Sequence, residues 1–177
     1  MLAGDIARAG IIRTFQQPRI YREMSVSANM LVSAAIRRAA FTDLFHRERR
    51  ETAKTLTELL DSVGLAAKRD TRAGDLSFGQ QKLLELAMAL VNEPEMLLLD
   101  EPTAGINPVL IASLIYRLKA ANRERGLTLL VIEHNMPVIM DLAEHINCLA
   151  HGRLLAEGPP HKIKGDAKVL DAYLGAA

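Results

Sequence analysis

The chain has 177 residues, a formal net charge of +1, 49% apolar residues and 24% charged residues. These values are typical of a single soluble domain with a substantial hydrophobic core. The near-neutral charge, with 4% aromatic residues and no Trp, argues against nucleic acid as a partner. The single cysteine, Cys148, excludes an internal disulfide and indicates a reducing compartment; we expect it to be buried.

Hydropathy and the first residues predict a cytoplasmic protein. No apolar run reaches the roughly 18 residues of a membrane-spanning helix. Asp5 and Arg8 lie where a secretory signal would continue into an apolar block. We therefore expect no direct membrane insertion and any membrane contact only through a partner.

The first half of the chain predicts one strand and then helices. A β-prone run predicts a strand over Ile11–Phe15, which Pro18 stops. The spacing of apolar residues predicts helices near Ser27–Ala40 and Leu44–Val63, with Gly64 as the C-cap of the second.

The next helix begins at Ser77, because Gln80 three residues later completes a capping-box pattern. An apolar face continues until the helix ends before Pro94. The apolar run Met96–Leu99 then predicts a strand buried on both faces of a parallel sheet.

The second half alternates helices with strands. Asn107 and Pro108 begin a helix that Gly126 stops, and Thr128–Ile132 is predicted to be a second buried strand. The last predicted elements are a helix over Asn135–Glu144, a strand over Ile146–Ala150 paired with Arg153–Ala156, and a helix over Ala167–Leu174. This alternation predicts an α/β fold with a parallel sheet.

Two segments carry the clearest chemistry. Asp100 and Glu101 end an apolar strand, where open α/β sheets bind ligands, so one carboxylate can hold Mg²⁺ and the other can orient a water molecule. Ser77 and Gly79 lie at a helix N-terminus, which favours anions such as phosphate. Taken one at a time, both features have a simpler explanation, namely carboxylates that cap the backbone and an ordinary capped helix.

Three polar residues follow other strands and turns. His134 follows Thr128–Ile132 and could hydrogen-bond a terminal phosphate or a water molecule. Gln16 follows the first strand, where its amide could bridge Mg²⁺ or water. Asn107 ends a tight turn after the acidic pair, placed to touch a facing subunit or the water.

Several strings in one order indicate a family. They are Leu-Ser-Phe-Gly-Gln-Gln at residues 76–81, Met-Leu-Leu-Leu-Asp-Glu-Pro at 96–102 and Val-Ile-Glu-His at 131–134. With them, the chain resembles the ATP-binding subunits of ABC transporters over essentially its whole length. Arg-Thr-Phe-Gln at 13–16 and Ala-Gly-Ile-Asn-Pro at 104–108 are similar to the branched-chain amino acid importers of that family.

The resemblance implies a P-loop NTPase-like α/β core with an inserted all-helical subdomain. Residues 1–17 would form a core strand and the Q-loop, and residues 18–94 the helical subdomain with the signature motif. Residues 95–177 would form the rest of the core, with the Walker B strand, the D-loop and the H-loop.

The resemblance also implies a role for each candidate residue. Asp100 and Gln16 would bind Mg²⁺, Glu101 would act as general base, and His134 would complete the catalytic set. ATP would be contacted by Gln16, Ser77, Phe78, Gly79, Gln80 and Asn107. The implied partners are membrane permease subunits and a second ATP-binding subunit, at the inner face of the cell membrane.

The chain departs from the family in its phosphate-binding loop. No Gly-Lys dipeptide occurs in the 177 residues, so the Walker A loop that should precede the other motifs cannot be assigned. Positioning is worth roughly 7–11 kcal/mol, whereas general-base help contributes only about 10²–10⁴-fold. We therefore expect an N-terminally truncated family member with negligible ATPase activity alone, and exposed strand edges that favour self-association.

Two other functions remain open at this point. One is a non-catalytic regulatory or interaction module with an ABC ATPase-like fold, which the missing loop favours. The other is a soluble ABC-type ATPase of DNA repair or translation, whose usual insertions or basic patches are not visible in this sequence.

Overall fold

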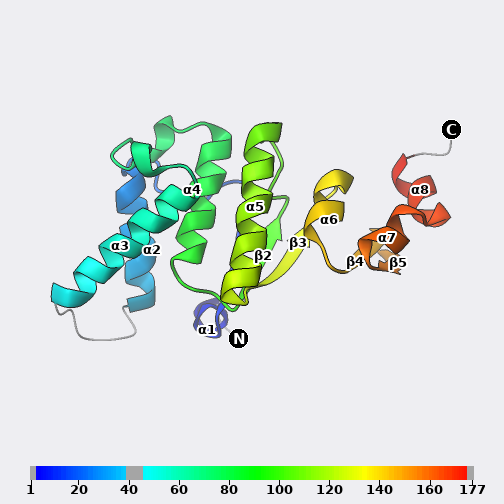
Figure 1. The fold of residues 1–177 in the computed structure, drawn as a ribbon, viewed down its shortest axis with the longest axis horizontal. Coiled ribbons are helices and arrows are strands. Elements are labelled where there is room, and N and C mark those ends of the chain that lie inside the picture. Colours follow the sequence, from blue (N-terminus) through cyan, green and yellow to red (C-terminus); the bar gives the residue numbers. More distant parts are fainter. Residues whose placement is uncertain (1–2, 39–45, 175–177) are drawn as a thin grey trace. The chain divides into compact units, whose positions relative to one another are not determined.

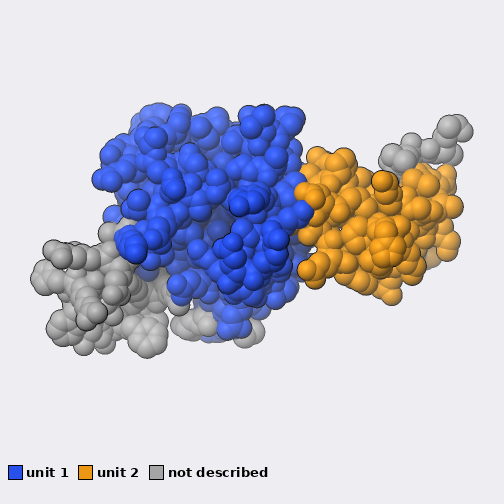
Figure 2. Space-filling model, viewed as in Figure 1, with its two compact units in different colours: residues 1–132 blue, residues 133–177 orange. Residues whose placement is uncertain are grey.

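The computed structural model describes residues 3–38 and 46–174. The chain divides into two compact units, residues 1–132 and residues 133–177, coloured separately in Figure 2. Within the described ranges, no helix combines the length and the apolar character needed to cross a bilayer. Residues 39–40 of the predicted helix Ser27–Ala40 and residues 44–45 of the predicted helix Leu44–Val63 lie outside the described residues.

The first unit contains a three-stranded parallel sheet in the order β1-β2-β3. Its strands are β1 (Ile11–Arg13), β2 (Met96–Asp100) and β3 (Thr128–Ile132). The central strand β2 pairs with strands that lie far from it in the sequence, with Leu97 opposite both Ile12 and Leu129. The predicted parallel α/β sheet is therefore present.

The prediction that β2 and β3 are buried on both faces is wrong. Leu97 and Leu99 are 0% and 3% exposed, but Leu98 between them is only half-buried. Leu130 and Ile132 of β3 are 47% and 60% exposed. The reason is that β3 is the end strand, with no described strand pairing along its outer edge, and one face of it is open to solvent.

A helical arm connects β1 to β2 (Figure 1). It consists of α2 (Val26–Arg38), α3 (His46–Ser62), two short 3₁₀ turns (Ala66–Lys68 and Ala73–Asp75) and α4 (Phe78–Leu90). Gly64 has a φ of +68° and follows the end of α3, as predicted for its C-cap. The two 3₁₀ turns were not predicted, because this segment is polar and has no helical periodicity.

Helix α5 (Pro108–Arg125) follows β2, with Asn107 as its N-cap and the left-handed Gly126 (φ +66°) as its C-cap. Leu114 and Leu118 of α5 are buried. Leu114 lines the same small pocket as Leu99 of β2, so the sheet and α5 share one core. A short unpredicted helix, α1 (Ala3–Arg8), precedes β1.

The second unit has its own small core. It contains α6 (Met136–Leu142), the antiparallel pair β4 (Ile146–Ala150) and β5 (Arg153–Gly158), α7 (Pro160–Lys164) and α8 (Ala167–Leu174). All but α7 were predicted. The core residues are Ile146, Cys148, Ile163 and Val169. Cys148 is buried as expected, and this burial raises the pKa of its thiol.

Candidate nucleotide site

The carboxyl ends of β1 and β2 bring three of the predicted residues together. Gln16 Nε2 donates a hydrogen bond of 2.9 Å to Glu101 Oε2. Asp100, the last residue of β2, accepts a hydrogen bond of 2.9 Å from Arg13 Nη2. Gln16 and Glu101 are 85 residues apart in sequence, so only the parallel pairing of β1 with β2 creates this site.

Arg13 is a site residue that sequence analysis missed. Its side chain is 55% exposed and that of Asp100 is 29% exposed. An ion pair this close to solvent contributes only about 0–1 kcal/mol. A bound cation can therefore compete with Arg13 for Asp100. The signal in the sequence was a charged residue at the end of a short strand, which is too common to be informative.

The backbone of Glu101 adopts an unusual conformation. Its φ is +47°, in the left-handed region that non-glycine residues seldom occupy. Its N–H donates to the carbonyl oxygen of Ile132 at 2.9 Å, and its carbonyl oxygen accepts from Lys82 Nζ at 2.6 Å. Contacts on both sides therefore hold this conformation and aim the carboxylate toward Gln16.

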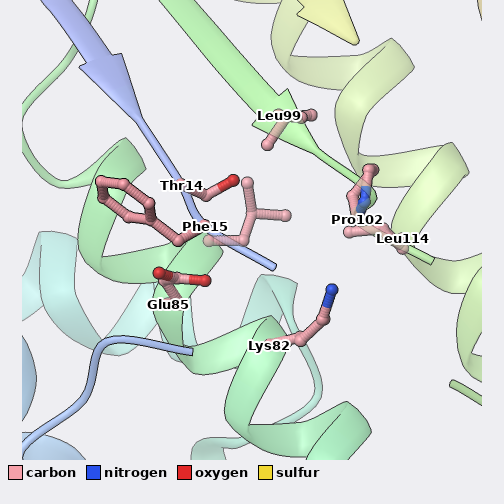
Figure 3. A pocket seen from close by; sticks show the side chains of 8 residues that line it. Thr14, Phe15, Lys82, Glu85, Leu99, Pro102 and Leu114 are labelled. Carbon is pink, nitrogen blue, oxygen red and sulfur yellow. The ribbon is translucent and has the colours of Figure 1, made fainter. Parts of the chain in front are cut away.

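A small pocket lies where the ends of β1 and β2 meet α4 and α5 (Figure 3). Its volume of about 20 Å³ is enough for about one water molecule and far too small for a nucleotide. Lys82 and Glu85 of α4 line it together with Thr14 and Phe15. Burial raises the pKa of the Glu85 carboxyl, although it accepts a hydrogen bond of 3.1 Å from the backbone N–H of Arg19.

The start of α4 forms the predicted capping box. Ser77 Oγ accepts from the Gln80 backbone N–H at 3.3 Å, and the Gln80 side chain accepts from the Ser77 N–H at 3.1 Å. Ser77 and Phe78 are exposed. The hydroxyl and the amide thus have local structural roles, but this helix start remains accessible to a ligand.

The turn before α5 packs directly against the start of α4. A Cβ atom on Gly79 would lie 2.9 Å from Leu110 Cδ1 and 3.1 Å from Ile106 Cγ2. A Cβ atom on Gly105, which has a φ of +71°, would lie 3.0 Å from Phe78 Cε1. Close packing therefore requires a glycine at position 79, which sequence analysis did not identify. The approach of phosphate predicted for Gly79 is a separate role.

The Asn107 side chain is engaged in the fold. Its Oδ1 atom accepts from the backbone N–H of Leu110 at 3.0 Å and caps α5. Asn107 itself is exposed. Its predicted contact with nucleotide or a facing subunit stays a prediction.

His134 belongs to the second unit, whereas Asp100 and Glu101 belong to the first. Its side chain is 71% exposed, and its backbone N–H donates to Glu133 Oε2 at 3.0 Å. The same carboxylate oxygen accepts from the Asn135 N–H at 3.1 Å. Glu133 thus fixes the backbone around His134, a role that sequence analysis missed, while the predicted catalytic role of His134 stays a prediction.

The oxygen donors at the end of β2 suit Mg²⁺. Among the described residues no group of three or more His, Cys, Asp and Glu side chains could hold a metal ion. However, Mg²⁺ in nucleotide sites is usually held by one or two carboxylates together with substrate phosphates. Asp100, Glu101 and the Gln16 amide provide donors of that kind, so the residues present fit a Mg²⁺–phosphate group.

Comparison with known proteins shows the family of the chain. Residues 3–104 match the protein family described as ABC transporter, and residues 153–177 match the branched-chain amino acid ATP-binding cassette transporter family. The chain is 36% identical over 179 residues to the high-affinity branched-chain amino acid transport ATP-binding protein BraF of Pseudomonas aeruginosa. That match covers 97% of this chain and 70% of BraF.

Solved structures show the same fold. The ADP conformation of MJ1267, an ATP-binding cassette of an ABC transporter, matches with a TM-score of 0.75 and 27% identity. This match covers 98% of the present chain and 71% of MJ1267. The dimeric post-hydrolysis structure of the ATP-binding cassette MJ0796, bound to ADP and Pi, matches with a TM-score of 0.72 and 27% identity, over 88% of this chain and 65% of that one.

Proposed function

Because this chain belongs to the ABC transporter family, in the branched-chain amino acid branch of its ATP-binding proteins, we propose that it is the ATP-binding subunit of a branched-chain amino acid importer. The observation that carries the proposal is the convergence of Gln16, Asp100 and Glu101 at the carboxyl end of β2. This edge of an α/β sheet is where nucleotides bind.

Each side chain has a role that its position supports. Asp100, once Arg13 is displaced, and the Gln16 amide supply oxygen ligands for Mg²⁺. Glu101 orients and deprotonates the attacking water, and its bond to Gln16 sets the direction of the carboxylate. Bound Mg²⁺ supplies neutralisation of the charge on the phosphates.

The exposed start of α4 acts on a nucleotide held by a second subunit. At this helix start Ser77 and Phe78 are exposed and Gln80 is half-buried, while Gly79 is buried against the turn before α5. The dimeric structure of MJ0796 supports a two-subunit arrangement in the family. Paired with a subunit that has a Walker A loop, this chain would complete the partner's site.

The coupling to transport requires permease subunits. Names of relatives such as BraF refer to branched-chain amino acid transport, which supports this solute class. We place the chain at the inner face of the cell membrane, held there by contacts with a permease. Closure and opening of the two-subunit assembly would then drive the transport cycle.

Mixed-subunit reconstitution tests the proposal. The partner is a BraF variant that has lost its ATPase activity through substitution in the segment that aligns with residues 77–80 of this chain. Adding the present chain should restore ATPase activity to this disabled BraF, and Ser77→Arg should abolish the rescue. Thr57→Arg, on the exposed surface of α3, is the matched control that should leave it intact. No rescue by the unmodified chain would refute the proposed donor role.

The isolated chain provides a second measurement. We expect negligible ATP turnover from it alone. If the chain alone turned over ATP and Glu101→Gln abolished this activity, the chain would have a complete site of its own.

A non-catalytic module with this fold is the second candidate, because the Arg13–Asp100 ion pair already neutralises the Mg²⁺ carboxylate. Titration with Mg²⁺ and ATP separates the two functions. In the mixed dimer, an ATP-binding subunit should show shifts at Ser77 and Gln80 that depend on Mg²⁺ and ATP, whereas an interaction module should show none.

A further inference from the structure

We infer that Lys82 and Glu85 of α4 are positioning residues that hold the two segments bearing Gln16 and Glu101 in register. The inference rests on the site proposed above and names residues outside its motifs. The two side chains lie one helical turn apart, three residues along α4, and therefore project from the same face. Figure 3 shows both beside the pocket between α4 and the ends of β1 and β2.

Lys82 acts on the segment that carries Glu101. Lys82 is only 5% exposed to solvent, so its ammonium group needs polar partners inside the protein. Nζ donates a hydrogen bond of 2.6 Å to the carbonyl oxygen of Glu101. Charge-assisted bonds of this kind are short and strong. Because Glu101 sits at φ +47°, this bond helps to hold a conformation that the residue alone disfavours.

Glu85 acts on the segment that carries Gln16. Its Oε1 atom accepts a hydrogen bond of 3.1 Å from the backbone N–H of Arg19, and the backbone of Phe15 lies close enough to stabilise the charged form of this carboxylate. Phe15 and Arg19 flank Gln16 on either side along the chain. One buried carboxylate therefore fixes both ends of the short loop that presents the Gln16 amide.

The segments held by Glu85 and Lys82 are joined by the hydrogen bond of 2.9 Å between the Gln16 amide and the Glu101 carboxylate. Both segments are thus held by the same turn of α4. This is the helix whose exposed start, at Ser77 and Phe78, is proposed to contact the nucleotide of a second subunit. A displacement of α4 would move Gln16 and Glu101 together. In this way a movement of the start of α4 would be transmitted to Gln16 and Glu101 of the same chain.

Nuclear magnetic resonance on the full ¹⁵N-labelled chain, without nucleotide, tests the inference. The reporters are the side-chain amide of Gln16 and the hydrogen-exchange rate of the Glu101 backbone amide, which bonds to Ile132. In Lys82→Met we expect the Gln16 amide resonances to move toward those of a solvent-exposed glutamine. Exchange at Glu101 should speed up by about tenfold relative to Leu97 in the same strand, because exchange reports local opening.

Conservative variants separate positioning from general packing. Lys82→Arg keeps a charged hydrogen-bond donor, so the Gln16 resonances and the Glu101 exchange rate should stay as in the unsubstituted chain. Glu85→Gln keeps an acceptor oxygen and should change these two signals less than Glu85→Met. Lys54→Met, an 80% exposed position on α3, is the control that should change neither. If Lys82→Met does not fold, the comparison of Glu85→Met with Glu85→Gln still decides the question.

Two results would overturn the inference. One is a Gln16 amide and Glu101 exchange rate that are unchanged in the Lys82→Met and Glu85→Met variants. The other is a uniform increase in exchange along β2 and α4, which would mean that the pair only stabilises the core. Failure of ATP binding in the mixed dimer would refute the proposed function while leaving these nucleotide-free signals unaffected, so the two failures can be told apart.

Discussion

The substitution Gly105→Ala measures how tightly the turn before α5 packs against the start of α4. Gly105 has a φ of +71°, and a Cβ atom there would lie 3.0 Å and 3.2 Å from two ring carbons of Phe78. Gly126 has nearly the same φ, +66°, but a Cβ atom there would meet nothing within 4 Å. Gly126→Ala is therefore a matched control with the same backbone strain and no collision.

The expected free-energy changes follow from this difference. The left-handed conformation costs an alanine about 1–2 kcal/mol relative to glycine, so Gly126→Ala should lower the free energy of unfolding by that amount. Gly105→Ala should lose an additional ~1 kcal/mol, at the low end of the cost of overpacking, because the partly exposed ring of Phe78 must shift to make room. Removing the ring with Phe78→Ala in the Gly105→Ala background should recover much of this additional loss.

Urea unfolding followed by far-UV circular dichroism gives these free energies. Both glycines lie in the unit formed by residues 1–132, so the same unfolding transition reports on both. Equal destabilisation by the two alanine substitutions would refute the packing of Phe78 on Gly105. A Phe78→Ala background that left the cost of Gly105→Ala unchanged would refute it as well.

Three further substitutions test other parts of the molecule. Ile132→Lys places a charge on the exposed face of β3, so self-association measured by sedimentation velocity should decrease. Val109→Lys, at a 79% exposed position on α5, should leave self-association unchanged. Equal association of the two variants would contradict a role for β3. Ser77→Ala should lower the free energy of unfolding by about 1 kcal/mol and Ser77→Asp should restore most of it, since both cap residues accept the Gln80 N–H; an unaltered stability in Ser77→Ala would argue against the cap. Burial raises the pKa of Glu85, so the folded chain keeps a proton that the unfolded chain releases, and stability should fall as the pH rises from the ordinary value of 4.5 through the raised folded pKa. Glu85→Gln should flatten that part of the urea-midpoint profile, and a slope that persists in the variant must come from another group.

The predicted elements agree with the structure where the signal is local. Ser77 with Gln80 and Asn107 with Pro108 predicted the starts of α4 and α5, and both caps are present. Gly126 ends α5 in the left-handed conformation that its position predicted. These features depend on the backbone groups of neighbouring residues, so a short stretch of sequence contains the whole interaction.

Burial of the strands was harder to predict, because it depends on neighbours that are distant in the chain. The run Thr128–Ile132 has the apolar composition of a strand that is covered on both faces. Ile132 is nonetheless 60% exposed, because β3 is the end strand of the sheet. Composition indicates what a strand can tolerate, whereas its exposure depends on which elements pack around it.

By itself, the sequence determined the order of the helices and strands, their caps, and the residue types that point to nucleotide chemistry. The tertiary structure alone decided which of those residues meet, as Gln16 does with Glu101 and Arg13 with Asp100. It also revealed Lys82 as a contact of the Glu101 backbone. The physical reason is that these contacts form only after the parallel strands pair and α4 packs against them, which no local pattern of residues records.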